Sequence, residues 1–217
     1  MYYQANFQRM TPAVKNLLLA NIAIFILQSL AGNDLNGMLI HVFGLVPKLA
    51  FENFFIWQFA TYMFLHGGLG HIFFNMFALW MFGVELENNW GTKEFLKFYF
   101  LTGIAAGLST AIFSWGSTIP TIGASGAIYG ILAAYALFFP DRYVYLYLLF
   151  PIKMKYLAVI LGVVEFISAR HGGSGIAHTA HLGGMIVGYI YLRYKYRHWG
   201  IGKDFFKNFF KGGGRPY

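Results

Sequence analysis

The sequence predicts an all-α membrane protein in which a polytopic bundle of six transmembrane helices forms one domain. Three observations lead to this prediction: an apolar composition, six separate apolar segments, and a one-sided distribution of basic residues. Of the 217 residues, 58% are hydrophobic and only 11% are charged, and the mean hydropathy is +0.54. These values lie far outside the usage of soluble globular chains, so the composition indicates an integral membrane protein.

Six apolar segments mark the expected membrane spans. Several are shorter than the ~20 residues that a span usually needs, so flanking aromatic residues or water near some helix ends should complete the match to the bilayer. We expect residues 1–16 to form a cytoplasmic segment, 17–194 the membrane domain and 195–217 a basic cytoplasmic tail. The spans cover residues 17–31, 69–84, 95–113, 122–139, 154–168 and 177–194.

Basic residues set the expected orientation of the spans. Of the 16 Lys and Arg residues, all except Lys48 and Arg170 fall in connections on one side. Such an excess marks cytoplasmic loops, so both termini are expected in the cytoplasm. The second, fourth and sixth spans would then begin near the external face. This parity gathers five polar residues in one outer layer: His66, His71, Ser125, His178 and His181.

The net charge of +8 and the absence of cysteine narrow the possible functions. The basic residues lie at the ends of apolar segments and in the tail, where anionic lipid is a better partner than nucleic acid. Without cysteine the chain has no disulfides, thiolate metal sites or cysteine nucleophile. Its chemistry must therefore use Ser, His, Tyr or carboxylate groups, and we expect no cofactor.

Ser125 is the candidate nucleophile, framed by Gly123 and Gly126 at the start of the fourth apolar segment. Small residues also recur where membrane helices pack closely, so the motif alone is equally explained by packing. The nucleophile interpretation requires a base. His181, at the start of the sixth segment, offers an imidazole on a helical face that also carries two glycines, which would let this face approach another helix closely.

Three further candidate residues lie in or near the outer layer. His71 and Asn75 are four residues apart and share one face of the second span, where they would either form interhelical hydrogen bonds or donate to a developing oxyanion. Glu165 lies near the outer end of the fifth span, and an acid at membrane depth is a functional candidate. Near an interface its carboxylate can simply reach water, which is the preferred interpretation here.

Taken together, these motifs resemble the rhomboid intramembrane serine proteases. The resemblance covers roughly residues 57–194. It rests on three motifs that follow one another on alternate spans: His-Ile-Phe-Phe-Asn at 71–75, Gly-Ala-Ser-Gly at 123–126 and Ala-His-Leu-Gly-Gly at 180–184.

The resemblance implies a role for each matching residue. Ser125 would be the nucleophile and His181 the general base. His71 and Asn75 would help to stabilise the oxyanion together with the backbone around Ser125, and Tyr129 would stack beside the base. Glu87, at the inner end of the second span, would have a structural role.

The sequence also departs from the family pattern. Gln58 follows Trp57 where many members have arginine, so any contribution of that arginine to loop structure is missing. His178 is an additional imidazole one turn before His181, and it could sustain weak activity if His181 were lost. No third member of the Ser–His dyad is evident from the sequence.

The predicted function is an intramembrane serine endopeptidase that hydrolyses peptide bonds in or near transmembrane segments of other membrane proteins, such as single-span proteins. We expect it in the cell membrane, with its active site opening towards the external face. Two other functions stay open. One is a catalytically silent rhomboid-like binder, and the other is a transporter or zinc site built from the histidines of the outer layer.

Overall fold

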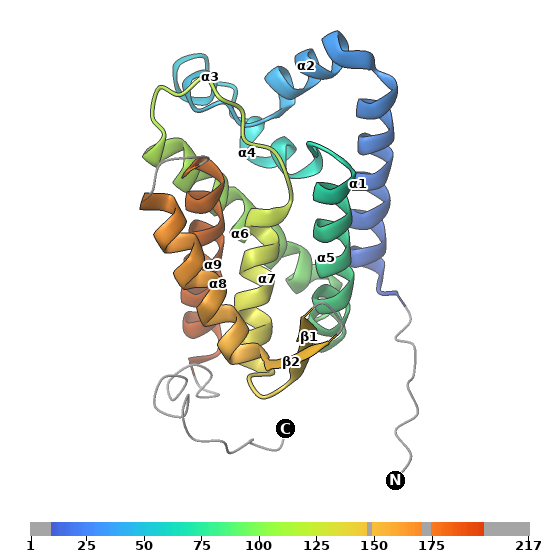
Figure 1. Cartoon of the computed structure of the whole chain (residues 1–217), viewed down its shortest axis with the longest axis vertical. Coiled ribbons are helices and arrows are strands. Elements are labelled where there is room, and N and C mark those ends of the chain that lie inside the picture. Colours follow the sequence, from blue (N-terminus) through green and yellow to red (C-terminus); the bar gives the residue numbers. More distant parts are fainter. Residues whose placement is uncertain (1–9, 147–148, 171–174, 198–217) are drawn as a thin grey trace.

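The computed structural model describes residues 10–146, 149–170 and 175–197, and these are mostly helical (Figure 1). Residues 1–9, 147–148, 171–174 and 198–217 lie outside the described residues. Most of the predicted cytoplasmic segment and of the predicted basic tail therefore stays a prediction.

Each predicted apolar segment coincides with a long helix. Helices α1, α5 and α6 are long and apolar enough to cross a membrane, whereas α7 is apolar but shorter, with 14 residues. A multi-pass membrane protein is therefore supported, and passage of all six helices through the bilayer stays a prediction. The helices are α1 (Pro12–Leu30), α5 (Leu69–Trp90), α6 (Thr92–Phe113), α7 (Ser125–Phe138), α8 (Met154–Arg170) and α9 (Gly175–Lys195).

The six long helices alternate in direction, so the first residues of α5, α7 and α9 lie on the same side of the bundle (Figure 1). This is the arrangement that the parity argument predicts. We call this side the site end of the bundle. Polar residues from three helices are therefore gathered in one layer by chain direction alone.

Helix α7 lies in the centre of the bundle. Of its 14 residues 11 are buried, and it contacts α5, α6, α8 and α9. The contact with α9 is close because glycines face one another across it, and a Cβ at Gly184 would overlap the carbonyl oxygen of Gly126. The predicted small-residue face of α9 is thus confirmed, and it brings the start of α7 against α9.

Helix α7 begins at Ser125 rather than at residue 122 as the hydropathy predicts. The segment before it forms an isolated antiparallel bridge between Thr121 and Leu45, which keeps it extended. Gly123 then has φ +121°, and a Cβ there would lie 2.7 Å from the ring of His71. Only glycine fits both the backbone conformation and the close approach of the imidazole, so Ser125 becomes the first helical residue.

Glu87 anchors the start of α1 to the C-terminal end of α5. Its carboxylate accepts hydrogen bonds from the backbone N–H groups of Ala13 and Val14, at 2.8 and 2.9 Å, and from the Thr92 hydroxyl at 2.7 Å. A carboxylate at a helix N-terminus satisfies unpaired N–H groups and complements the helix dipole. The structural role of Glu87 is confirmed, and α1 begins at Pro12, earlier than predicted.

The connection between α1 and α5 is folded around Gln58, whose side chain is fully buried. The amide accepts a hydrogen bond from the Val46 N–H at 3.0 Å and donates to the carbonyls of His41 and Val42 at 2.9 and 3.2 Å. Because an amide both donates and accepts, Gln58 itself supports the loop at the position where the sequence lacks an arginine. The elements are α2 (Gly32–Phe43), α3 (Pro47–Glu52), α4 (Gln58–Thr61) and the 3₁₀ turn η1 (Tyr62–Phe64).

A short hairpin between α7 and α8 corrects the all-α prediction. Strands β1 (Tyr143–Leu146) and β2 (Phe150–Lys153) pair antiparallel at the end of the bundle opposite the site end (Figure 1). Aromatic and β-branched residues favour strands, which explains the departure from helix in this aromatic stretch. The side chains of Tyr145 and Phe150 are well exposed.

Candidate active site

Ser125 and His181 meet at the site end of the bundle. The Ser125 hydroxyl oxygen lies 2.7 Å from His181 Nε2, although the two residues are 56 positions apart in the chain. Ser125 is the first residue of α7. His181 lies about one turn before Gly184 on the same face of α9, where α9 approaches α7. The glycine contact between the helices thus determines the separation of hydroxyl and imidazole.

Tyr129 fixes the plane of the His181 ring. The two rings stack with centroids 4.1 Å apart and planes 6° from parallel. Tyr129 lies one turn after Ser125 on α7, so one helix supplies both the hydroxyl partner and the stacking partner of the imidazole. The predicted stacking is confirmed, and it restricts rotation of the ring about its own axis.

Glu165 of α8 lies behind His181 and was not assigned to the site from the sequence. Its carboxylate accepts the Tyr129 hydroxyl proton at 2.5 Å and lies 2.5 Å from His178 Nδ1 and 3.0 Å from His181 Nδ1. The residue is 6% exposed, so the expectation that its carboxylate reaches water is wrong. The signal in the sequence was an acid at membrane depth.

The contact between Glu165 and His181 is close but not aligned. The 3.0 Å separation is short enough for a hydrogen bond, yet the direction of the ring N–H does not meet hydrogen-bond geometry. Catalytic hydrogen bonds are often poorly aligned without substrate, so the 3.0 Å separation makes Glu165 a candidate hydrogen-bond partner of His181. Ser125, His181 and Glu165 therefore form a continuous row across three helices.

His71 covers the segment that leads into Ser125. Its Nδ1 accepts a hydrogen bond from the Gly67 N–H at 3.3 Å, so in the neutral ring the proton is on Nε2. The Cε1 and Nε2 atoms are the ring atoms closest to Gly123. An N–H donor therefore lies beside the backbone two residues before Ser125. The buried ring of His66 packs edge-on against His71, with centroids 5.0 Å apart.

Asn75 lies one turn after His71 on α5 and is buried. Its Nδ2 donates to the His71 carbonyl at 2.8 Å, a bond within the helix instead of the interhelical bond considered from the sequence. In the part of the chain that the structure describes, no hydrogen bond joins Asn75 to Ser125. The second N–H of the amide is left for another acceptor.

One cluster of possible metal ligands is present among the described residues, and it differs from the four-histidine set considered from the sequence. Glu165, His178 and His181 each offer an atom within 4.8 Å of the others. His66 and His71 are not part of this cluster. The carboxylate already contacts each of the two imidazoles directly, which accounts for the clustering of the three side chains.

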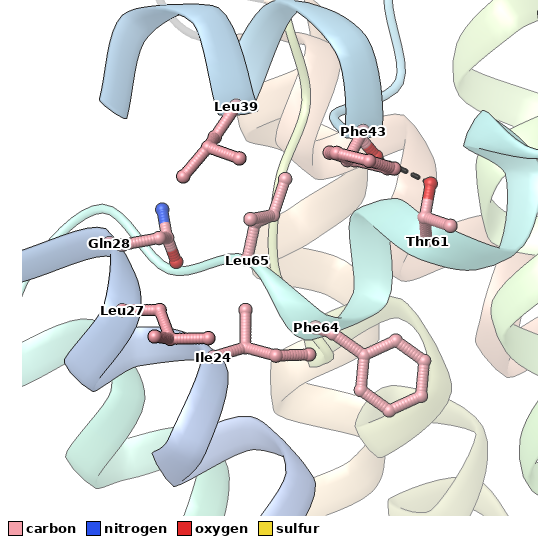
Figure 2. A pocket seen from close by; sticks show the side chains of 8 residues that line it. All are labelled: Ile24, Leu27, Gln28, Leu39, Phe43, Thr61, Phe64 and Leu65. Carbon is pink, nitrogen blue, oxygen red and sulfur yellow. Dashed lines mark hydrogen bonds between the residues drawn. The ribbon is translucent and has the colours of Figure 1, made fainter. Parts of the chain in front are cut away.

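A separate apolar cavity of about 340 Å³ lies between α1, α2 and η1 (Figure 2). The amide of Gln28 at its edge accepts a hydrogen bond from the His66 N–H at 3.0 Å, and the Thr61 hydroxyl donates to the Phe43 carbonyl at 2.7 Å. The polar side chains that line the cavity are thus already hydrogen-bonded within the protein, and neither Ser125 nor His181 lines this cavity. The lining residues are Ile24, Leu27, Gln28, Leu39, Phe43, Thr61, Phe64 and Leu65.

The fold and the site define a multi-pass helical membrane protein with a serine–histidine pair at the start of its central helix. The Rhomboid domain family matches residues 53–198, which is more than half of the chain. The chain therefore belongs to the rhomboid family, as the sequence motifs imply.

Similar proteins include one named a protease and one named inactive. The chain is 30% identical over 191 residues to the rhomboid protease GluP of Bacillus subtilis (strain 168), covering 85% of this chain and 35% of that protein. It is 35% identical over 114 residues to the inactive RHOMBOID-like protein 8 of Arabidopsis thaliana, covering 51% and 32%. It is 31% identical over 136 residues to the mitochondrial rhomboid protein 1 of Saccharomyces cerevisiae, covering 59% and 38%. The chain spans about a third of the length of these relatives.

Proposed function

We propose that this protein is an intramembrane serine endopeptidase that hydrolyses peptide bonds in or near transmembrane segments of other membrane proteins. The observation that carries the proposal is the 2.7 Å contact between the Ser125 hydroxyl and His181 Nε2. A serine hydroxyl is a weak nucleophile until a base within hydrogen-bonding distance can take its proton. Membership of a family with a named protease supports the same function.

The reaction follows from this contact. His181 Nε2 takes the hydroxyl proton as Ser125 Oγ attacks the peptide carbonyl, which gives a tetrahedral oxyanion. The imidazolium then gives its proton to the leaving amine, the C–N bond breaks, and an acyl ester remains on Ser125. Water attacks the ester with His181 again as base, and the carboxylic acid and the free hydroxyl result. Side chains and water supply every proton.

Three groups are proposed to stabilise the oxyanion. The first backbone N–H groups of α7 have no partner within the helix, and the positive end of the helix dipole lies there. His71 adds its Nε2–H beside Gly123, and Asn75 has one amide N–H left. Fixed donors of this kind act mainly on the charge that develops in the transition state.

Asn75→Ala tests the third donor. If its amide stabilises the oxyanion, kcat should fall by ~10-fold up to ~1,000-fold with little change in KM. We expect an effect near the lower limit, because backbone groups and His71 share the charge. The measurement is kcat, KM and Tm on one preparation. An unchanged kcat with a lower Tm would show that Asn75 has no part in stabilising the oxyanion and acts only structurally, through its hydrogen bond to the His71 carbonyl.

We further propose that all six long helices cross the cell membrane, with both termini in the cytoplasm and the site end towards the external face. The alternating helix directions and the distribution of Lys and Arg support this topology. Water would reach the site from outside. The substrates would be single-span or other transmembrane proteins, reached through the lipid bilayer, and nucleic acid would not be a partner.

Purified protein in liposomes tests the proposed function against its two alternatives. A serine-directed fluorophosphonate should label Ser125 and stop cleavage of a single-span reporter substrate, and a metal chelator should leave cleavage unchanged. A silent rhomboid-like binder would hold the substrate without cleavage or labelling. Inhibition by the chelator alone would instead favour the zinc site at the histidines.

A further inference from the structure

Glu165 occupies a position that a simple salt bridge or surface acid does not explain. It comes from α8, while its partners come from the two other helices that carry the hydrolytic pair: Tyr129 from α7, and His178 and His181 from α9. The ion pairs of Glu165 within the described chain are to histidines alone. A carboxylate buried this deeply is costly unless hydrogen-bond donors surround it.

The two carboxylate oxygens have separate partners. Oε1 receives the Tyr129 hydroxyl and faces His181 Nδ1, whereas Oε2 faces His178 Nδ1. An ionised carboxylate only accepts hydrogen bonds, so the atoms that face it must carry protons. Nδ1 of His181 is therefore the protonated nitrogen, and in the neutral ring the lone pair lies on Nε2.

That tautomer is the one the reaction needs. Nε2 faces the Ser125 hydroxyl at 2.7 Å and can take a proton only if it carries none itself. After the transfer the ring is an imidazolium, and its positive charge lies 3.0 Å from a carboxylate that is shielded from water. Coulomb attraction at this distance is stronger in a poorly solvated site than in water.

We infer that Glu165 is a positioning residue for the proposed hydrolysis, so that Ser125, His181 and Glu165 act as a triad. The carboxylate holds His181 in the tautomer that leaves Nε2 free, and it stabilises the imidazolium that forms. Tyr129 and His178 hold the carboxylate in place by donating to it. This inference rests on the proposed function and adds a third member to its serine–histidine pair.

Glu165→Gln tests the inference, because the amide keeps the size of the side chain but loses its charge and one acceptor. The readouts are the rate at which a fluorophosphonate labels Ser125, kcat and KM for a single-span reporter substrate, and Tm. We expect the labelling rate and kcat to fall by ~100-fold to ~10,000-fold, with KM nearly unchanged. Glu165→Asp retains the charge on a shorter side chain and should recover part of both rates.

Glu94→Gln is the matched control. Glu94 also accepts a tyrosine hydroxyl, from Tyr191 at 2.7 Å, and also holds α9, through an ion pair with Lys195. It lies in the first turn of α6, and α6 begins at the end of the bundle opposite the site end (Figure 1). It should change Tm without changing the labelling rate. If Glu165→Gln behaves like this control, with a lower Tm and a normal labelling rate in the folded protein, the inference is wrong and Glu165 only clamps the helices.

A measurement on the unaltered protein keeps the test independent of variant folding. Nitrogen-15 NMR of the histidine rings reports the tautomer of His181, assigned by the signal that disappears in His181→Ala. A proton on Nδ1 agrees with the inference, and a proton on Nε2 in the neutral ring overturns it. Unaltered protein that neither labels nor cleaves would instead contradict the proposed protease function itself.

Discussion

Ser125→Ala is expected to abolish cleavage of a single-span substrate while the protein stays folded. Loss of a serine nucleophile lowers kcat by ~10⁶-fold in a serine protease, which here means activity below detection. The structural cost is small because alanine suits a helix, and one hydrogen bond to His181 contributes ~0.5–1.5 kcal/mol. Cleavage and Tm should be measured on the same preparation.

Ser109→Ala provides the control for this experiment. The Ser109 hydroxyl donates to the Ala105 carbonyl at 3.0 Å within α6, so its removal also deletes one partly buried hydrogen bond. Its cleavage rate should equal that of the unaltered protein. Full activity in Ser125→Ala would remove Ser125 from the reaction and with it the proposed mechanism.

His181→Ala should lose nearly all activity, whereas His178→Ala should retain most of it. Of these two imidazoles, that of His181 contacts the Ser125 hydroxyl, whereas His178 is held by Glu165 with its ring centroid 6.4 Å from that of His181. We expect a fall in kcat of ~10⁴-fold or more for His181→Ala and less than ~10-fold for His178→Ala.

The two histidine variants control for each other, because each removes one imidazole from the Glu165 carboxylate. If both variants lower Tm by a similar amount but differ widely in kcat, the chemical role of His181 is separated from the structural role that both histidines share. The reverse ranking of kcat would show that His178, and not His181, is the general base. Substantial activity in His181→Ala would mean that His178 can turn from Glu165 to Ser125.

Much of this site follows from local patterns in the sequence. Hydropathy located the six long helices, and the parity of apolar segments placed Ser125 and His181 at the same end of the bundle. Glycine spacing predicted the close contact of α7 with α9, which follows because the helical repeat puts residues three and four apart on one face.

Other features were decided by the tertiary structure. Hydropathy predicts that the fourth helix begins at residue 122. The β-bridge between Thr121 and Leu45 and the imidazole of His71 beside Gly123 keep this segment extended, so the helix begins at Ser125. The sequence shows that Gln58 stands where an arginine is common, but only the structure shows the backbone groups that fold back around it and satisfy its amide. Each outcome depends on segments far away in the sequence.

Glu165 shows the limit of the sequence most clearly. The sequence by itself determined that an acid lies near the end of an apolar helix, and that position alone is equally compatible with contact to water. Whether the carboxylate points to water or to His181 depends on the rotation of α8 about its axis and on what α7 and α9 place beside it. The tertiary structure decided this because donors from those two helices surround the carboxylate, and a buried charge is stable only where such donors meet.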